Sequence, residues 1–427
     1  MNIYKVICIL YISSYHPISN VFYFKRMIIE ESPSRSPDTR LSKWAAEIRD
    51  IRDKISEDIT IKQKSMDHLN DIVTFNSMLF YTGFFFSFMD YTYIFPWLMM
   101  GLSISSHWTT VSHHVSHGGY NDETKYNRFT YGVKFRRFFD WMDYILPEAW
   151  SCEHNVYHHY MLNEYNDPDN VQHNLIILRS MNAPYLIKYG IIAFFAATWR
   201  IFYYSSNSYK YYKANKLKYT MQKEDYKQMT LFGIVTNEWP SWINKVEYFT
   251  HVLLPVLLYR VSCFLIVYAI SFYFPFVITY GGLKNVVINY IIADLLCNIH
   301  TFAIIVPNHS GKDMYLFNTP VKGKSDEWLL RQCISSTNYN TGNNVIDYLQ
   351  GWLNYQIEHH LFPDMSAYEY QVMQKDVERV CKKYGIPYVS ENIFVRLWKT
   401  VKIMTGQESI PYFEGSELEK YVYQRIS

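Results

Sequence analysis

The sequence predicts an all-α integral membrane protein, in which about four transmembrane helices form two hairpins and a helical cap lies on the cytoplasmic side. Four apolar stretches come close to the roughly 20 residues that a helix needs to cross a bilayer. Only a few residues separate the members of each pair, so each pair returns the chain to the membrane face from which it left. The four stretches are 72–88, 92–108, 252–279 and 285–307.

Residues 1–70 are expected to form a polar N-terminal extension that contains one amphipathic helix. From Trp44 onward, isoleucines recur at helical spacing as far as Ile59, so one face of the helix is apolar and rests on a surface such as that of the membrane. The extension is rich in Arg and Lys, and the positive-inside rule keeps it in the cytoplasm. The apolar run 7–12 is short for a signal peptide or a membrane span, and a polar segment opens at Met27, so we expect translation to start at Met27.

The polar segment 118–183 separates the first hairpin from a further apolar run, 184–203. This run contains Lys188 and Arg200, and a lysine-rich stretch follows it. A complete crossing here would place charged residues in lipid and much positive charge outside the cytoplasm. We therefore expect 184–203 to be an interfacial helix, which leaves both hairpins opening on the same membrane face.

The composition excludes two classes of protein. The net charge is only +2, and no basic stripe with interleaved aromatic residues is present, so no nucleic-acid binding is expected. The six cysteines include no C-x-x-C pair, which argues against a disulfide scaffold or a cysteine-based zinc site.

Ten of the fifteen histidines fall into short clusters beside the apolar stretches. Neutral imidazole is the commonest protein ligand for transition metals, and residues four apart on an α-helix share one face. That spacing joins His113 with His117 and His154 with His158. His359 and His360 are adjacent, so their side chains diverge and could reach two different ions. The clustered residues are His113, His114, His117, His154, His158, His159, His300, His309, His359 and His360.

About eight imidazoles are too many for one tetrahedral zinc ion, but they suit two ions with five or six ligands each. Acidic residues are scarce within the clusters, which separates them from the Glu-x-x-His carboxylate bundles. A nitrogen-rich, redox-capable site favours iron, although zinc or manganese remain alternatives on ligand type.

Two histidines of the clusters are expected not to be ligands. His114 lies about 100° round the helix from His113 and is expected to support the ligands beside it. His300 and His309 are nine residues apart, so a straight helix would point them in opposite directions. His309 follows Asn308 at the membrane edge and is the better ligand, whereas His300 is expected to be a packed polar residue within the membrane.

The remaining polar residues of interest receive plainer interpretations. Asp294 stands in an apolar run, where a carboxylate is costly, and it either holds a ligand or faces a polar cavity. Five histidines without partners at ligand spacing are expected to be surface, packing or interfacial residues: His16, His68, His107, His173 and His251.

The three motifs H-H-V-S-H, H-N-V-Y-H-H and Q-I-E-H-H resemble the three histidine boxes of the membrane fatty acyl desaturases. The stretch G-W-L-N-Y-Q-I-E-H-H-L-F-P, followed by C-K-K-Y-G-I-P-Y, is similar to the front-end group, in which a glutamine, here Gln356, replaces the first histidine of the last box. The resemblance covers roughly residues 70 to 395. It implies a membrane desaturase domain over 71–395 and a C-terminal tail over 396–427.

Carried over residue by residue, the resemblance implies a non-haem centre of two iron ions with O2 as co-substrate. Asn308, Gln356 and His114 would then lie around the ligands, and no catalytic residue beyond the ligands is implied. The implied metal ligands are His113, His117, His154, His158, His159, His309, His359 and His360.

The resemblance also implies the partners. The substrate would be a fatty acyl chain carried by coenzyme A or a phospholipid, and the membrane would be the endoplasmic reticulum in a eukaryote or the inner membrane in a bacterium. Many front-end desaturases carry a fused cytochrome b5 domain with an H-P-G-G motif, but His16-Pro17 is followed by Ile-Ser. A separate electron donor, such as cytochrome b5 or a ferredoxin, is therefore expected.

Two other functions share part of this evidence. Hydroxylation of a lipid, sterol or carotenoid on the same di-iron scaffold uses most of the same histidines. A histidine-rich metal transporter would need ligands within the membrane crossings, whereas these clusters lie beyond the ends of the apolar runs.

Overall fold

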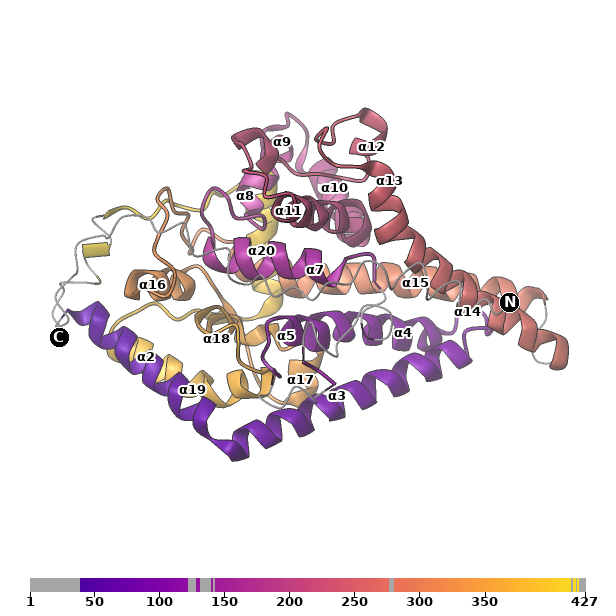
Figure 1. Ribbon diagram of the computed structural model, residues 1–427, viewed down its shortest axis with the longest axis horizontal. Helices are drawn as coiled ribbons and strands as arrows, with labels where there is room; N and C mark the ends of the chain where they lie inside the picture. Colours follow the sequence, from indigo (N-terminus) through magenta and orange to yellow (C-terminus); the bar gives the residue numbers. More distant parts are fainter. Residues whose placement is uncertain are drawn as a thin grey trace.

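The computed structural model describes residues 39–121, 128–130, 140, 143–275, 280–415, 418, 419 and 421. These residues are mostly helical with almost no strand (Figure 1), which confirms the all-α prediction. The strands in this part of the chain are β1 (Asn338–Tyr339) and β2 (Ser390–Glu391), which pair in parallel. Translation start at Met27, the run 7–12 and His16 lie outside the described residues.

The N-terminal amphipathic helix is present as α2 (Arg40–Glu57). Its apolar face, which includes the fully buried Trp44 and Ile48, packs against α19 (Ala367–Lys383) and α16 (Asp326–Ile334). The surface on which this helix rests is therefore formed by α16 and α19 of the protein itself, rather than by the membrane surface given above as an example. Ile59 is not part of this face, since it begins the next helix and is 80% exposed.

Helices α3 (Ile59–Phe85) and α4 (Ile94–Ser106) form the first predicted hairpin. They pack closely because glycines remove side chains from the contacts. A Cβ atom at Gly83 would lie 2.6 Å from the carbonyl oxygen of Pro96, and one at Gly101 would lie 2.9 Å from that of Ala293. Helix α4 is thereby held between α3 and α15 (Tyr280–Ile305).

Three helical segments in the described residues are long and apolar enough to cross a membrane, namely Tyr185–Lys216, Lys245–Tyr273 and Gly281–His309. The last two contain α14 (Leu254–Tyr273) and α15, the second predicted hairpin. The first begins with the run that we expected to be interfacial, and its length and composition would also allow a crossing. Helices α3 and α4 are not among the three.

The segment Tyr185–Lys216 comprises α10 (Tyr185–Trp199), the π-helical turn η4 (Arg200–Tyr204) and α11 (Ser205–Lys216). Its buried charges are paired or hydrogen-bonded, as burial requires. Lys188 donates to the carbonyl oxygens of Arg179 and Thr405, at 3.0 Å each, and Arg200 forms an ion pair with Asp143. The ammonium of Lys188 thereby ties the start of α10 to the end of α20 (Ile393–Thr405).

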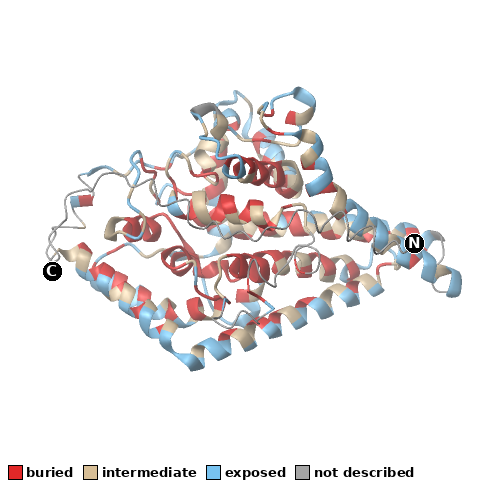
Figure 2. Ribbon diagram, viewed as in Figure 1, coloured by how far each residue is buried: buried red, intermediate tan, exposed pale blue. Residues whose placement is uncertain are grey.

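Buried residues gather in the middle of the molecule, in α5 and α18 and in the helix that begins with α7 (Figure 2). Several short helices connect the longer ones around this centre. The remaining bounds are α5 (His113–Ser116), α7 (Pro147–Trp150), α8 (Val171–Asn174), α9 (Ile176–Ser180), α12 (Gly233–Thr236), α13 (Lys245–Tyr248), α17 (Asn344–Leu349) and α18 (Gln356–Leu361), with further π and 3₁₀ turns η2 (His107–Ser112), η3 (Ser151–His158), η5 (Lys223–Tyr226), η6 (Phe249–Leu253), η7 (Val306–His309) and η8 (Leu353–Tyr355).

The packing of α2 generates a stability prediction. Ile48→Ala should lower the free energy of unfolding by about 2–5 kcal/mol, because it opens a cavity between α2 and the helices α16 and α19. Ile59→Ala is the matched control, since the side chain is exposed and its loss should change the value by less than about 0.5 kcal/mol. Chemical denaturation in detergent micelles measures both. Equal effects of the two substitutions would show that α2 does not pack as described.

Candidate metal centre

The first histidine cluster lies on α5, which continues the helix that begins as α4 and passes through a π-helical turn. The π-helical turn η2 precedes α5, and the backbone N–H of His117 then donates to the carbonyl oxygen of His113 at 3.2 Å. These two residues are therefore four apart on an α-helical turn and lie on one face, as the spacing predicts.

The second cluster does not have the α-helical geometry that the sequence led us to expect. His154 and His158 lie on the π-helix η3, where the N–H of His159 donates to the carbonyl oxygen of His154 five residues earlier. The wider turn brings Nε2 of His154 within 3.3 Å of Nε2 of His159. His154 thus pairs with His159, and it also keeps the expected neighbour His158, whose ring stacks on it with centroids 5.0 Å apart. Single π-helical turns of this kind are rare and occur mainly at functional sites.

The third cluster lies on the short helix α18. His359 and His360 are adjacent there, so their rings point about 100° apart. The ring of His359 lies near His113, with the two Nε2 atoms 3.0 Å apart, whereas the ring of His360 stacks on His159 with centroids 4.2 Å apart.

The structure brings the eight predicted ligands into two adjoining groups. Within each group, one ligand atom from every residue lies within 4.8 Å of the others. The first group has five imidazoles and the second has three: His113, His117, His154, His159 and His359 in the first, and His158, His309 and His360 in the second. Almost all of these side chains are buried.

Hydrogen bonds orient the rings of both groups. His158 donates from Nδ1 to Asp167 at 2.9 Å, His360 donates to Gln332 at 2.9 Å, and His309 donates to the carbonyl oxygen of Ser335 at 3.0 Å. Each acceptor fixes the proton on Nδ1, so that Nε2 is the nitrogen that carries the lone pair.

His359 is oriented in the same way through Tyr370. The hydroxyl of Tyr370 donates to the carbonyl oxygen of Phe362 at 2.9 Å, so its oxygen is free to accept from Nδ1 of His359 at 3.3 Å. His359 therefore also presents Nε2 to its group.

These orienting residues were not predicted from the sequence. Asp167 and Asp169 follow the second cluster closely in N-D-P-D-N, and that proximity was a signal that could have identified them. Asp169 lies 3.7 Å from Nδ1 of His158 and 4.0 Å from Nδ1 of His154, so it also qualifies as a ligand. Gln332 and Tyr370 gave no comparable signal, because only the packing of α16 and α19 on α18 brings them to the site.

The residues present fit a pair of metal ions. Four ring nitrogens of the two groups are buried and have no hydrogen-bond partner among the described residues, on His117, His154, His159 and His360. Such orphaned nitrogens are costly unless something else satisfies them. Five imidazoles in one group and three in the other, with no sulfur, suit first-row transition metals such as iron, copper, nickel or zinc.

Burial keeps most of these imidazoles neutral, as metal binding requires. Desolvation lowers the pKa values of the buried rings far below the usual value, and neighbouring imidazoles lower them further; the residues concerned include His117, His154, His159, His359 and His360. His158 is the exception. Burial lowers its pKa, but the carboxylates of Asp167 and Asp169 outweigh that effect and raise it.

The three residues expected to lie around the ligands have different surroundings. Nδ1 of His114 bonds the carbonyl oxygen of Thr110 at 2.7 Å, and the ring belongs to neither group. The amide of Gln356 donates to Nε2 of His309 at 2.9 Å, while its own Oε1 is buried without a partner in the described residues. Asn308 donates to the carbonyl oxygen of Leu353 at 3.5 Å. Gln356 is thus the one of the three that faces a ligand nitrogen.

Other polar residues that the sequence singled out lie away from the two groups. His300 is hydrogen-bonded at both nitrogens, to Ser105 at 2.6 Å and to the carbonyl oxygen of Leu349 at 2.7 Å. Asp294 pairs with Arg260 of α14, which neither of the expected interpretations anticipated.

An apolar cavity of about 190 Å³ opens beside both groups. Its walls come from α10, η4 and the ends of α15 and α20, and they are mainly aromatic and aliphatic. His113, His154, His158 and His309 form one side of it, and Trp108, Phe195, Trp199, Tyr203, Tyr204 and Met404 are among the residues opposite and around them. The arrangement places a nitrogen-rich site against a space suited to a hydrocarbon chain.

Comparisons with known proteins agree with this chemistry. The family model described as fatty acid desaturase matches residues 91–392, which is more than half of the chain. No solved structure matches the chain.

Individual relatives are distant. An sn-1 linoleoyl-lipid 6-desaturase of Arthrospira platensis is 20% identical over 70% of this chain and 73% of its own length. An NADPH-dependent stearoyl-CoA 9-desaturase of Mycobacterium tuberculosis is 30% identical over 26% of each chain, and a Delta(6)-fatty-acid desaturase of Caenorhabditis elegans is 34% identical over 23% of this chain and 20% of its own. The matched segment thus spans only about a quarter of the mycobacterial relative's length.

The hydrogen bond from His360 generates a prediction on metal affinity. Gln332→Leu leaves Nδ1 of His360 without its acceptor and should weaken metal binding by roughly 10–100-fold. Gln63→Leu changes an exposed glutamine far from the site and should leave the affinity unchanged. Metal titration of the purified, stripped protein measures both. An unchanged affinity for Gln332→Leu would contradict the orienting role of this residue.

The lowered pKa values generate a prediction on pH. In the metal-free protein these imidazoles stay neutral, whereas in the unfolded chain they take up protons near pH 6.5. The unfolded state therefore binds more protons, and the free energy of unfolding should fall as the pH drops below about 6.5, by up to about 1.4 kcal/mol per pH unit for each such group.

Thermal unfolding of stripped protein between pH 8 and pH 5.5 checks this. His360→Gln should reduce the dependence on pH, whereas His251→Gln, at an exposed position, should not. A melting temperature that is constant over this range would mean that the rings are not desolvated as described.

Proposed function

The chain belongs to the fatty acid desaturase family, and from this we propose that it is an O2-dependent oxidoreductase that inserts a double bond into a lipid acyl chain. The observation that carries the proposal is the meeting of two imidazole groups with an apolar cavity. A metal store or transporter needs the first feature but has no use for the second.

The proposed cofactor is a pair of iron ions, one in each group. Bound iron would supply the O2 chemistry needed to remove hydrogen from an unactivated C–H bond, which side chains cannot do. His113, His117, His154, His159 and His359 would hold one ion, and His158, His309 and His360 would hold the other. Rotation of the Gln356 amide would turn its unpartnered Oε1 toward the second group, where an oxygen ligand completes a set of only three nitrogens.

The protein's own part is to bind and orient the acyl chain and to exclude water. The indoles of Trp108 and Trp199 lie 5.6 Å apart by ring centroid and form an apolar wall of the cavity together with Phe195. A methylene held against this wall lies close to His113 and His154. The shape of the cavity beside these rings would decide which carbon reaches the metal site.

We infer that four helices, α3, α4, α14 and α15, form the membrane crossings. Helix α4 packs along both α3 and α15, and the two hairpins extend together away from the histidine groups (Figure 1). With this topology all eight histidines open on one face, which the basic N-terminal segment assigns to the cytoplasm. The paired Lys188 and Arg200 favour an interfacial α10 beside them.

Electrons would come from a separate carrier, such as cytochrome b5 or a ferredoxin, and the acyl chain would be carried by coenzyme A or by a phospholipid. The names of the relatives include both kinds of substrate, stearoyl-CoA and linoleoyl-lipid. The lipid class in which new double bonds first accumulate distinguishes the two carriers.

Expression in a host with simple saturated and monounsaturated fatty acids tests the proposal. Gas chromatography of the lipids should reveal new double bonds, and His159→Ala should abolish them because it removes a nitrogen at the junction of the two groups. His251→Ala is the control and should leave the product at the parent level. Hydroxylated lipids in place of new double bonds would identify the chain as a hydroxylase, and full activity of His159→Ala would contradict the ligand assignment.

A further inference from the structure

His309 is the one predicted ligand that does not lie within a histidine box. It ends the 3₁₀ turn η7, where the long helix α15 gives way to an irregular segment. A turn of this kind has few backbone hydrogen bonds of its own, so the direction of the imidazole depends on what holds the turn. Nδ1 of His309 bonds Ser335, and its carbonyl oxygen accepts from Asn163 at 3.4 Å.

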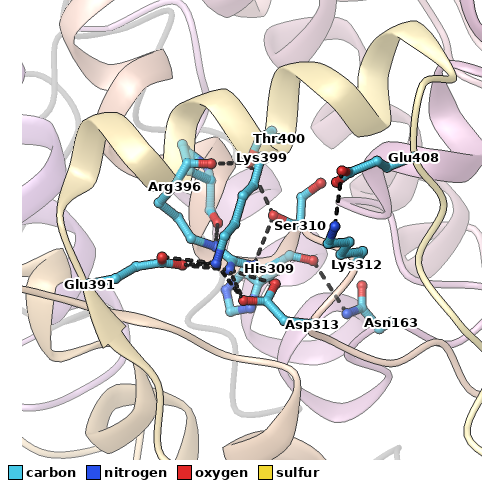
Figure 3. Close-up of polar contacts among 11 residues, drawn as sticks. Asn163, His309, Ser310, Lys312, Asp313, Glu391, Arg396, Lys399, Thr400 and Glu408 are labelled. Carbon is cyan, nitrogen blue, oxygen red and sulfur yellow. Dashed lines mark hydrogen bonds and ion pairs between the residues drawn. The ribbon is translucent and has the colours of Figure 1, made fainter.

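The guanidinium of Arg396 holds the backbone on both sides of His309. Arg396 lies on α20 and is fully buried. Its Nε donates to the carbonyl oxygen of Pro307 at 3.2 Å, and its Nη2 donates to that of Ser310 at 2.9 Å. Thr400, one turn further along α20, donates to the same carbonyl of Ser310 at 3.1 Å (Figure 3).

The remaining nitrogen of the guanidinium, Nη1, forms ion pairs with two carboxylates. Nη1 of Arg396 lies 2.7 Å from Asp313 and 2.9 Å from Glu391. Lys399, which is partly exposed, binds the same two carboxylates at 2.8 Å (Figure 3). Two cations therefore share two anions, but only Arg396 also reaches the turn that carries His309.

The turn is shaped to receive the guanidinium. A Cβ atom at Gly311 would collide with Nη2 of Arg396 and with a carboxylate oxygen of Asp313. Any other residue at this position would push the guanidinium away from the carbonyl oxygen of Ser310.

We propose that Arg396 is a positioning residue that directs His309 into the second imidazole group. Helix α20 would then help to orient a metal ligand. The proposal rests on the proposed function for the identity of the metal. It concerns a residue beyond 392, where the match to the desaturase family model ends.

The rival explanation is that Arg396 merely neutralises two carboxylates and stabilises the fold. The two roles separate in the variant Arg396→Lys. A lysine keeps the positive charge beside Asp313 and Glu391, but its single ammonium cannot serve both carbonyl oxygens in place of the planar guanidinium. The control Lys399→Gln removes a charge from the same carboxylates and leaves the turn untouched.

The experiment uses the full chain, purified in detergent and loaded with ⁵⁷Fe. Mössbauer spectra of the parent should contain two iron sites, and Arg396→Lys should weaken iron binding at one of them by roughly 10–100-fold, as expected when a ligand loses its support. The other site should keep its spectrum, and Lys399→Gln should keep both. Retention of both spectra by Arg396→Lys, or equal loss of iron from the two variants, would overturn the proposal.

Hydrogen exchange in the stripped protein supplies a reading that does not depend on iron. Arg396→Lys should accelerate exchange in the peptide 306–314 relative to the parent, and Lys399→Gln should not. Unchanged exchange in Arg396→Lys overturns the positioning role whatever the metal content. Absence of iron from the parent would contradict the proposed function. Accelerated exchange in Arg396→Lys would still support the role of Arg396 in holding the turn.

Discussion

The structure depends on the burial of eight imidazoles in one place. Buried ring nitrogens must find partners, and neutral rings at close quarters present lone pairs to each other rather than proton donors. Nδ1 protons fixed by Asp167, Gln332, Ser335 and Tyr370 leave four Nε2 atoms facing inward. Cations would satisfy a concentration of lone pairs of this kind, so the arrangement of the rings suits metal binding.

The helices around the site satisfy this constraint with local departures from α-helical geometry. The π-helical turn η3 lets His154 and His159 meet and sends His158 into the second group. The 3₁₀ turn η7 redirects the chain at the end of α15 so that His309 joins the same group. The two imidazole groups thus lie at the ends of membrane-length helices, beside the cavity that aromatic side chains line.

Much of this could be read from the sequence, because hydropathy and histidine spacing are local signals. Predicting the all-α class, the apolar hairpins and the gathering of the eight histidines required no knowledge of tertiary contacts. The pairing of His154 with His159 could not be predicted, since a π-helical turn has no clear sequence signature. The roles of Gln332, Tyr370 and Arg396 also could not be predicted, because each comes from a helix other than the one that carries the histidine it supports, and only tertiary packing brings the two together. The same limit made the apolar face of α2 look like a membrane surface helix, when its partner is α19.

Iron K-edge X-ray absorption on the purified full-length protein, combined with its metal content, tests the central claim most directly. The account predicts two iron ions per chain, with nitrogen and oxygen as the only nearest ligands and imidazole scattering beyond them. A single zinc ion, sulfur among the nearest ligands, or no bound metal after expression in iron-replete cells would contradict it.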